Sequence, residues 1–406
     1  MKRNFFILLL IGLLTSSFGF STTPPSKILS SFNKVLGGGK YDIGRAIVKA
    51  HDSGYVIAGR SIGTSGNMDM SLWKVDDGGN VIWNFKFGDT ETEEVYDIIQ
   101  TKDGGYITVG SSDSYGFSVD IKDTWVVKVD ARGKLVWRHT YGDQVSIEEG
   151  TCIKATEDGG YIIGGKIITL DSEDPSGDAF VLKIDGNGTE EWRKTYGGAK
   201  NDEAVDIAIS EGGYTIIGNT ESSGKGKWDI WMFNIGLDGT LKWEKTYGGG
   251  DTEKANQFVQ TPDGGFAIVG YSYTFAEASL DCWVVKTDAS GVQQWHKSFG
   301  GLSYDEGNGI TVTSDGGFAV VGYTEVWVPD EYGDNTSLDG FNTLLVKLDA
   351  NGNKLWEKSI GGVKEQRGYA VLEAANQDLI IVGSKQTSDQ NNFGILLIRT
   401  NPNGSI

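Results

Sequence analysis

The sequence predicts an all-β protein: a seven-bladed β-propeller of four-stranded antiparallel blades, closed by an N-terminal strand that completes the last blade. Three observations predict this fold class. Asp-Gly-Gly turns recur along the chain, each followed by an aromatic residue. The apolar stretches between turns show no helical period. Tryptophans recur every 51 to 55 residues, with one interval of 61, a spacing typical of propeller arrays; they are Trp83, Trp137, Trp192, Trp243, Trp295 and Trp356.

Each repeat predicts four short strands in a fixed order. The first strand ends at the Asp-Gly-Gly turn, and the second begins at the aromatic residue after it. The third strand carries a lysine, and the fourth carries the tryptophan after an Asp-x-x-Gly turn. Such turns are strong hairpin signals because Gly, Asp and Asn accept positive φ. The second repeat shows the order clearly, with its turn at 103–105, Lys128 on the third strand and Trp137 on the fourth.

The two ends of the repeat array predict how the ring closes. The last repeat runs from Glu365 to Ile406 and stops just before its expected tryptophan. Residues 32–38 match residues 192–198 position for position, with Phe32 in the tryptophan slot. A strand near Phe32 therefore completes blade seven and covers an edge that would otherwise be exposed. The predicted boundaries are a signal peptide at 1–19, a linker at 20–27 and the propeller at 28–406.

One further glycine recurs in every repeat. Either the backbone there needs positive φ, or neighbouring blades approach too closely for a side chain. We favour close approach. The column comprises Gly59, Gly110, Gly165, Gly218, Gly270, Gly322 and Gly383.

The first residues predict export from the cytoplasm. A basic start at residues 2–3 precedes an apolar run from Phe5 to Leu14, and small residues follow at Ser17 and Gly19. This order is typical of a secretory signal peptide. The alternative, a membrane anchor, is disfavoured because the run is short for a bilayer of about 30 Å. We expect a mature chain without a membrane span that is secreted, periplasmic or on the cell surface.

Composition excludes several classes of function. The 406 residues carry a formal charge of −19, so phosphates would be repelled and nucleic acid is not an expected partner. Twelve tryptophans and only six prolines argue against glycine-rich disorder. Cys152 and Cys282 fall in different repeats and are expected to be buried and unpaired. We expect a monomer.

Searching for catalytic and metal motifs yields little. No nucleophile elbow, His-Glu-x-x-His, Cys-x-x-Cys or phosphate loop is present, so no catalytic residue and no cofactor is predicted. The three histidines lie in separate repeats. Two turns, starting at Asp185 and Asp349, begin like calcium loops but lack the sixth-position glycine and the twelfth-position glutamate. A calcium-stabilised propeller stays open as a weak alternative, and the metal content is unknown.

The repeat resembles the Asp-Gly-Gly propeller repeats of bacterial secreted proteins known as SBBP repeats. The strings at 158–165 and 192–198 carry this resemblance, which covers essentially all of residues 28–406. It implies the fold and says little of function. More distantly, Asp-x-x-Gly-x-x-x-Trp is similar to the tryptophan motif of quinoprotein propellers. That motif's alanine, threonine and adjacent cysteine pair are missing here, so the likeness implies shared blade packing and no cofactor.

Strand order divides the predicted loops between two faces. The Asp-Gly-Gly and Asp-x-x-Gly turns lie on one face, called here the turn face. The variable loops lie on the other, called the loop face, and binding in repeat folds usually sits where loops vary. Exposed aromatics there stack on sugar rings or anchor a peptide; in the alternative, the loops fold over the blade ends and bury them. The candidate ligand-binding residues are Tyr115, Phe117, Tyr273, Phe275, Trp327, Tyr332 and Asp334.

The loop face also carries one acid at the start of each first strand except the last, where Gln366 stands. One interpretation is a cation or ligand site at the channel mouth. The favoured one is structural: a local carboxylate per blade that accepts hydrogen bonds from the Gly-Gly turn or pairs with a lysine. A second acid column that opens the third strands is expected to be structural for the same reason. The channel-mouth acids are Asp42, Glu93, Glu148, Asp202, Glu253 and Asp305.

These observations favour an extracytoplasmic, non-enzymatic binding or scaffold propeller whose ligand is a glycan or a protein or peptide. The alternative is a hydrolase or lyase that acts on polysaccharide with carboxylates at the channel mouth. That alternative requires two acids about 5–10 Å apart in a pocket flanked by exposed aromatics.

Overall fold

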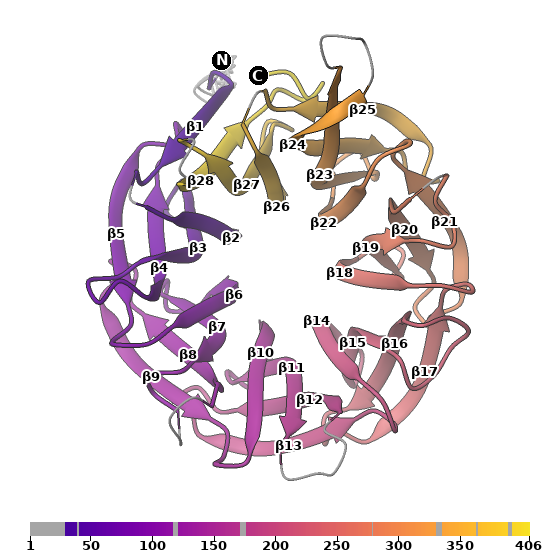
Figure 1. The fold of residues 1–406 in the computed structure, drawn as a ribbon. Coiled ribbons are helices and arrows are strands. Elements are labelled where there is room, and N and C mark those ends of the chain that lie inside the picture. The colour runs from indigo at the N-terminus through magenta and orange to yellow at the C-terminus, as the bar shows by residue number, and fades with distance from the viewer. Residues whose placement is uncertain are drawn as a thin grey trace, which may run out of the picture.

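The computed structural model describes residues 29–38, 40–116, 121–170, 176–277, 279–329, 335–362, 364–388 and 392–406. The predicted signal peptide and linker lie outside these ranges. Side chains of residues 327–339 are also outside the description. The described chain forms seven four-stranded antiparallel sheets arranged as the blades of a propeller (Figure 1), which confirms the predicted fold class.

Each blade is named in chain order and its strands run from the axis outward. Blade one contains β2 (Asp42–Lys49), β3 (Tyr55–Ile62), β4 (Met68–Val75) and β5 (Val81–Phe87). Blade two contains β6 (Glu93–Gln100), β7 (Tyr106–Ser112), β8 (Asp123–Val129) and β9 (Leu135–Tyr141). Blade three contains β10 (Ser146–Ala155), β11 (Tyr161–Thr169), β12 (Gly177–Ile184) and β13 (Glu190–Tyr196). Blades four and five are β14 (Asp202–Ser210), β15 (Gly213–Thr220), β16 (Asp229–Gly236) and β17 (Leu241–Tyr247); and β18 (Glu253–Gln260), β19 (Phe266–Ser272), β20 (Asp281–Thr287) and β21 (Gln293–Phe299).

Blade six contains the longest strands, and blade seven takes its outer strand from the other end of the chain. Blade six is β22 (Asp305–Val312), β23 (Phe318–Pro329), β24 (Asn335–Leu348) and β25 (Lys354–Ile360). Blade seven is β26 (Gln366–Glu373), β27 (Leu379–Gln386), β28 (Phe393–Arg399) and β1 (Phe32–Leu36).

The ring closes through the predicted N-terminal strand. β1 pairs antiparallel with β28, from Phe32 opposite Arg399 to Leu36 opposite Ile395. Leu36 is buried and Phe32 packs against the hydrophobic cluster shared by blades seven and one. The pairing confirms closure and covers the edge of β28, which would otherwise expose unpaired backbone groups.

The core lies between blades. Trp83 on the outer strand of blade one meets Tyr106 of blade two edge-to-face, with ring centroids 6.4 Å apart. Trp192 and Tyr214 repeat this contact between blades three and four at 6.5 Å. The tryptophan column therefore packs one blade against the next, as the repeat predicts.

The repeated glycine column is explained by close approach, but within a blade rather than between blades. A Cβ on Gly110 would stand 1.9 Å from the carbonyl oxygen of Glu94 on the adjacent strand of the same blade. Its counterparts meet the equivalent carbonyl at 1.7–2.1 Å, and none of the seven has positive φ. The carbonyl belongs to the innermost strand, just before a β-bulge.

One predicted loop is a strand ribbon instead. From the spacing of the repeats, the sequence predicts the longest variable loop of the chain at Tyr323 to Gly340. The backbone of β23 pairs with β24 far beyond the blade, out to Pro329 opposite Asn335. The β-branched and aromatic residues of 323–328 favour this extension.

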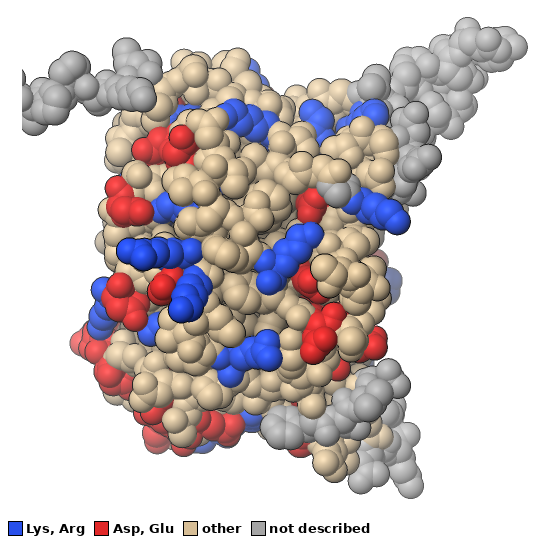
Figure 2. Space-filling view, turned by 90° about the vertical axis from the view of Figure 1, so that its left-hand side faces the viewer, with Lys and Arg blue, Asp and Glu red and all other residues tan. Residues whose placement is uncertain are grey.

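No helix among the described residues is long and apolar enough to cross a membrane. Cys152 and Cys282 are both buried free thiols. On the side of the molecule shown in Figure 2, Lys and Arg side chains are interspersed with Asp and Glu over the surface.

Candidate ligand site at the channel mouth

A β-bulge interrupts every innermost strand at the same place. In β2 the pairing with β3 skips Arg45, and each of the other six strands skips the equivalent residue. A bulge re-aims the extra side chain and is frequent beside functional sites. The seven skipped residues, called here the bulge ring, are Arg45, Tyr96, Thr151, Val205, Asn256, Asn308 and Tyr369.

All seven bulge-ring residues line one cavity of about 470 Å³. Glu203, Lys254 and Glu306 line the same cavity, and they are the second residues of their strands. Because the innermost strands run from the loop face toward the turn face, this cavity lies at the loop-face end of the channel. The repeat that governs the rest of the blade is absent here: the ring contains one arginine, two tyrosines, two asparagines, a threonine and a valine.

Hydrogen bonds tie part of the bulge ring to neighbouring blades. Thr151 Oγ1 donates to the carbonyl of Ala204 at 2.9 Å. Asn256 Nδ2 donates to the carbonyl of Gly307, and Asn308 Nδ2 to that of Gly368, both at 2.9 Å. Each acceptor is the residue just before the next blade's bulge. Among the residues described, the side chains from blades seven, one and two form no such bond.

That untied part contains a cation stacked on an aromatic ring. The guanidinium carbon of Arg45 lies 4.8 Å from the ring centroid of Tyr369. Tyr96 stands on the other side, on the next blade, and burial raises its pKa, with further contributions from Glu149 and Glu94. Blades seven, one and two therefore present two phenol rings and a guanidinium to the cavity.

The second residues of the innermost strands form a charged tier above the ring. Lys254 Nζ pairs with Glu203 at 3.1 Å and lies 3.5 Å from the ring centroid of Trp228. Glu306 accepts a hydrogen bond from Asn256 at 2.9 Å and one from the hydroxyl of Tyr323. Burial raises the pKa of Tyr323, with Glu306 adding to the rise, so this phenol stays protonated and donates.

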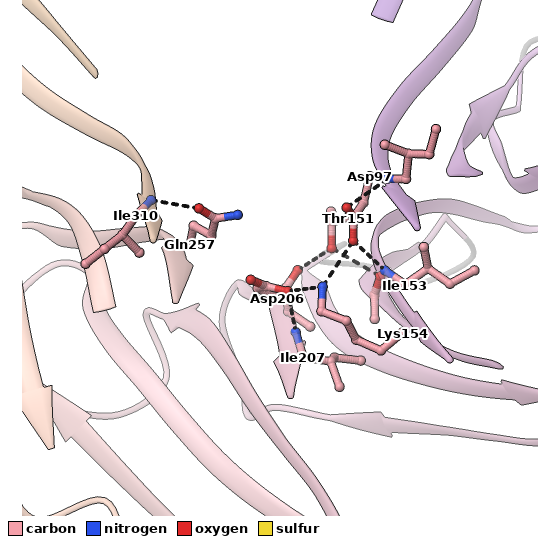
Figure 3. Close-up of polar contacts among 11 residues, drawn as sticks. Asp97, Thr151, Ile153, Lys154, Asp206, Ile207, Gln257 and Ile310 are labelled. Atoms are coloured by element: carbon pink, nitrogen blue, oxygen red, sulfur yellow. Dashed lines mark hydrogen bonds and ion pairs between the residues drawn. The ribbon is translucent and has the colours of Figure 1, made fainter. Parts of the chain in front are cut away.

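A partly buried ion-pair bridge lies on the turn-face side of the ring (Figure 3). Lys154 of blade three pairs with Asp206 of blade four at 2.9 Å and with Asp97 of blade two at 3.2 Å. Burial disfavours the charged amine, but the two carboxylates outweigh it and raise the pKa of Lys154. Gln257 accepts a hydrogen bond from the backbone N–H of Ile310 at 2.8 Å. These groups line a smaller cavity of about 150 Å³, so ligand space is concentrated toward the loop face.

The six acids predicted at the channel mouth lie elsewhere. Asp42, Glu93, Glu148, Asp202, Glu253 and Asp305 are all at most 4% exposed. Five accept a hydrogen bond from the backbone N–H four residues earlier, at 2.6–3.2 Å. In blades four, five and six the residue after the acid lines the cavity instead, because successive side chains of a strand face opposite ways.

Glu148 departs from the other five. It binds the guanidinium of Arg193 through both carboxylate oxygens, at 2.6 and 2.5 Å. Burial raises the pKa of Glu148 to about 7 even though Arg193 opposes the rise. Among the described contacts, Glu148 accepts no hydrogen bond from the backbone N–H group four residues earlier, unlike the other five acids.

The loop aromatics divide into two groups. Tyr273 is 42% exposed and meets Tyr271, which lines the cavity, edge-to-face at 6.3 Å. Tyr115 stacks on Trp125 at 5.4 Å and its hydroxyl donates to the carbonyl of Gly88 at 3.0 Å. Phe275 stacks on Trp283 in the same way at 5.2 Å, with 36% of its surface exposed. Only Tyr273 of these three reaches the cavity's neighbourhood.

Four other candidates fall outside the description. Phe117, Tyr332 and Asp334 lie outside the described residues, and Trp327 is described in backbone only, within β23. Their role in ligand binding stays a prediction.

Metal ligands are likewise not assembled in the part of the chain that the structure describes, where no three His, Cys, Asp or Glu side chains are placed to hold an ion. The carboxylate of Asp185 accepts the backbone N–H groups of Asn187 and Thr189, both at 2.8 Å. Asp349 does the same with Asn351 and Asn353. These turns use their carboxylates internally.

Sequence reasoning missed the bulge ring. The available signal was a position three residues after each acid that varies freely while the residue before it stays small or apolar. It also missed the lysine partners: Lys183 pairs with Asp158 of the Asp-Gly-Gly turn at 2.9 Å, whereas the aspartate two residues after it, Asp185, caps its own turn.

Comparison with known proteins supports the fold and no family. No family model matches the chain. The regulatory protein FlaEY of Caulobacter vibrioides is 24% identical over 223 residues, which cover 47% of this chain and 23% of that protein. The chain thus spans less than a quarter of that relative's length.

Solved structures share the architecture at low sequence identity. Puromycin hydrolase has a TM-score of 0.55 and 11% identity, covering 91% of this chain and 55% of that one. BBS1N in complex with ARL6DN has a TM-score of 0.53 and 11% identity, covering 93% and 98%. The polysaccharide lyase Uly1 has a TM-score of 0.52 and 11% identity, covering 92% of each chain. At these identities the likeness shows the propeller fold alone.

Proposed function

We propose that this chain is an extracytoplasmic, non-enzymatic binding propeller that takes a glycan at the loop-face mouth of its channel. One observation carries the proposal: the bulge ring supplies seven non-repeating side chains to one cavity within an otherwise repeating frame. Residues kept alike in every blade serve the blade, whereas a ligand needs one particular set of groups. The signal peptide predicted at 1–19 and the resemblance to secreted SBBP repeats support the extracytoplasmic location.

The chemistry of the cavity suits sugars. Tyr96, Tyr271 and Tyr369 offer aromatic faces with a polar tip, which pack against sugar rings while bonding hydroxyls. Asn256 and Asn308 add amides, and Glu203 and Glu306 add hydroxyl acceptors. A cavity of about 470 Å³ is of the size that small ligands occupy, about 300–1,000 Å³. A peptide or protein ligand is the competing class.

The enzymatic alternative, a hydrolase or lyase acting on polysaccharide, has two carboxylates available in the cavity. Each is already engaged: Glu203 accepts from Lys254 and Asn219, and Glu306 from Asn256 and Tyr323. Carboxylates that already accept hydrogen bonds from the protein are better suited to binding a ligand than to transferring a proton. Binding is therefore the function we put forward, and catalysis is an outcome of the test.

The test is a glycan array and a peptide array probed with the mature chain, followed by calorimetry on the best ligand. Tyr96→Ala is expected to weaken glycan binding at least tenfold, because it removes a cavity face. A variant with residues 327–339 replaced by a short turn is expected to bind normally. Loss of binding in the shortened variant but not in Tyr96→Ala would move the site to the blade-six ribbon. Peptide binding alone, or appearance of shortened glycan products, would overturn the proposal.

A further inference from the structure

Arg45 is distinguished from the other cations of the channel mouth by what it lacks. Among the residues that the structure describes, it makes no hydrogen bond and no ion pair; its Nε is buried without a hydrogen-bond partner, as are those of Arg60 and Arg367, but those two arginines have an ion pair as well. The other cations of the mouth each pair with a glutamate: Arg60 with Glu94, Lys122 with Glu149, Lys254 with Glu203 and Arg367 with Glu365.

The surroundings of Arg45 hold its guanidinium in a defined place. The group lies over the ring of Tyr369, and the bulge in β2 directs the side chain into the cavity rather than into the blade. An aromatic ring below one face leaves the N–H groups around the edge of the guanidinium available. A buried donor without a partner is costly, so such a group is normally matched by an acceptor.

We infer that Arg45 binds a carboxylate of the ligand, so that the glycan proposed for this site is an acidic one built with sugar acids. The inference rests on the proposed function and names its ligand class. A planar guanidinium matches a planar carboxylate through two parallel N–H···O bonds. In this arrangement the sugar ring lies against Tyr96 or Tyr369, and its hydroxyls face the amide of Asn308.

The acidic chain tolerates an anion here because its local charges are matched. The five glutamates of the mouth are occupied: Glu94, Glu149, Glu203 and Glu365 by the cations named above, and Glu306 by Asn256 and Tyr323. Repulsion from more distant acids is screened over about 10 Å at 0.1 M salt. Arg45 therefore acts on a ligand carboxylate at close range, where the formal charge of −19 has little weight.

The experiment compares an acidic glycan with its own methyl ester. The mature chain is titrated with oligogalacturonate and oligoalginate, with the carboxyl-methylated form of whichever binds more tightly, and with a neutral galactan of equal length. The wild-type chain is expected to bind the acidic form at least tenfold more tightly than the ester, because the ester keeps the sugar and removes the charge.

Two variants separate recognition from general charge. Arg45→Gln is expected to bind acid and ester equally, whereas Lys134→Gln, which removes the same unit of charge at an exposed position of the turn face, is expected to keep the preference. Since Arg45 has no hydrogen bond or ion pair to lose, only its contact with the ring of Tyr369, its variant should melt close to the wild-type chain. Equal binding of acid and ester by the wild-type chain, or a preference kept in Arg45→Gln, would overturn the inference and leave the proposed function standing. Absence of binding to every glycan would instead refute the proposed function.

Discussion

The two faces of the propeller use the same strands in opposite ways. At the turn face the third-strand lysine reaches the aspartate of the first turn in five blades, at 2.6–3.0 Å, and Arg399 with Asp378 repeats the pair in blade seven. Blade four alone has Asn234 in the lysine position. At the loop face the bulge ring follows no such rule. Repetition therefore marks the end of the blade that maintains the fold, and its absence marks the end available to a ligand.

The faces also differ in how they treat carboxylates. The pKa of Asp158 at the turn face is lowered to about 2, chiefly by the hydroxyl of Thr156, with Gly160 and Lys183 contributing. Asp103 and Asp263 are lowered to about 2 in the same way. At the loop face, burial raises the pKa of Asp281 and of Asp305. Protonation of these three turn-face carboxylates is thus disfavoured, whereas protonation of the two loop-face carboxylates is favoured.

The largest expected effect distinguishes glycines of the two faces. Gly110→Ala places a Cβ 1.9 Å from the carbonyl oxygen of Glu94, beside the bulge that positions Tyr96. We expect the free energy of unfolding in urea to fall by about 3 kcal/mol or more, because backbone must move. Gly104→Ala at the turn face meets no atom within 4 Å and has φ +83°, so about 1–2 kcal/mol is expected from backbone strain alone. Equal losses would refute the close-approach explanation.

A crossed pair of variants tests whether stability and binding reside on different faces. Lys183→Met removes a buried amine that pairs with Asp158 and Glu191, and we expect a loss of about 1–3 kcal/mol in unfolding free energy with unchanged ligand affinity. Arg45→Gln is expected to do the reverse, with stability within about 0.5 kcal/mol of wild type. For each variant, urea unfolding measures the free energy of unfolding and calorimetry measures the ligand affinity. The contrast between the faces fails if both properties change together in either variant.

The smallest expected effect has opposite signs at the two faces. Because the folded-state pKa of Asp158 lies below its unfolded value, its carboxylate stabilises the fold above about pH 4, and this stabilisation is lost as the pH falls toward 2. Asp158→Asn should therefore lower Tm at pH 7 by roughly 1–3 °C and make little difference near pH 2.

The matching variant at the loop face is Asp281→Asn. Since burial raises the pKa of Asp281, the folded state favours its protonated form and gains stability as the pH falls. An amide should then raise Tm at pH 7 and lose this advantage in acid. Asn342 already occupies the equivalent position of blade six, so the amide fits. A lowered Tm at both pH values would contradict the assignment.

Much of the fold could be predicted because its determinants repeat. Six tryptophans, a glycine column and paired turns recur in register, and Phe32 in the tryptophan slot was enough to locate the closing strand. Repetition adds the same signal several times, so each strand assignment supports the others. The exception within the fold is the ribbon of β23 and β24, which has no counterpart in other blades.

The site could not be predicted for the same reason. The acids recur in register but face into the blade, whereas the cavity is lined by the residue after the acid in three blades and by the residue skipped at the β-bulge in all seven. Glu93 is buried and Glu94 is its neighbour at the mouth. Arg45 and Tyr369 occupy the same position of their repeats, the residue skipped at the bulge, and their contact depends on the order of blades around the ring rather than on any local pattern.

The pairing of β1 with β28 determines when the proposed ligand site forms during folding. Arg45 belongs to blade one and Tyr369 to blade seven, on either side of the seam that this pairing closes. Contacts between segments so distant in sequence form late, after most local hairpins exist. The site proposed for a ligand carboxylate, at Arg45 and Tyr369, should therefore form only when the ring closes. A partly folded chain should lack this site. A ligand bound there would contact both blade one and blade seven, and its binding free energy would stabilise the closed ring over the open one.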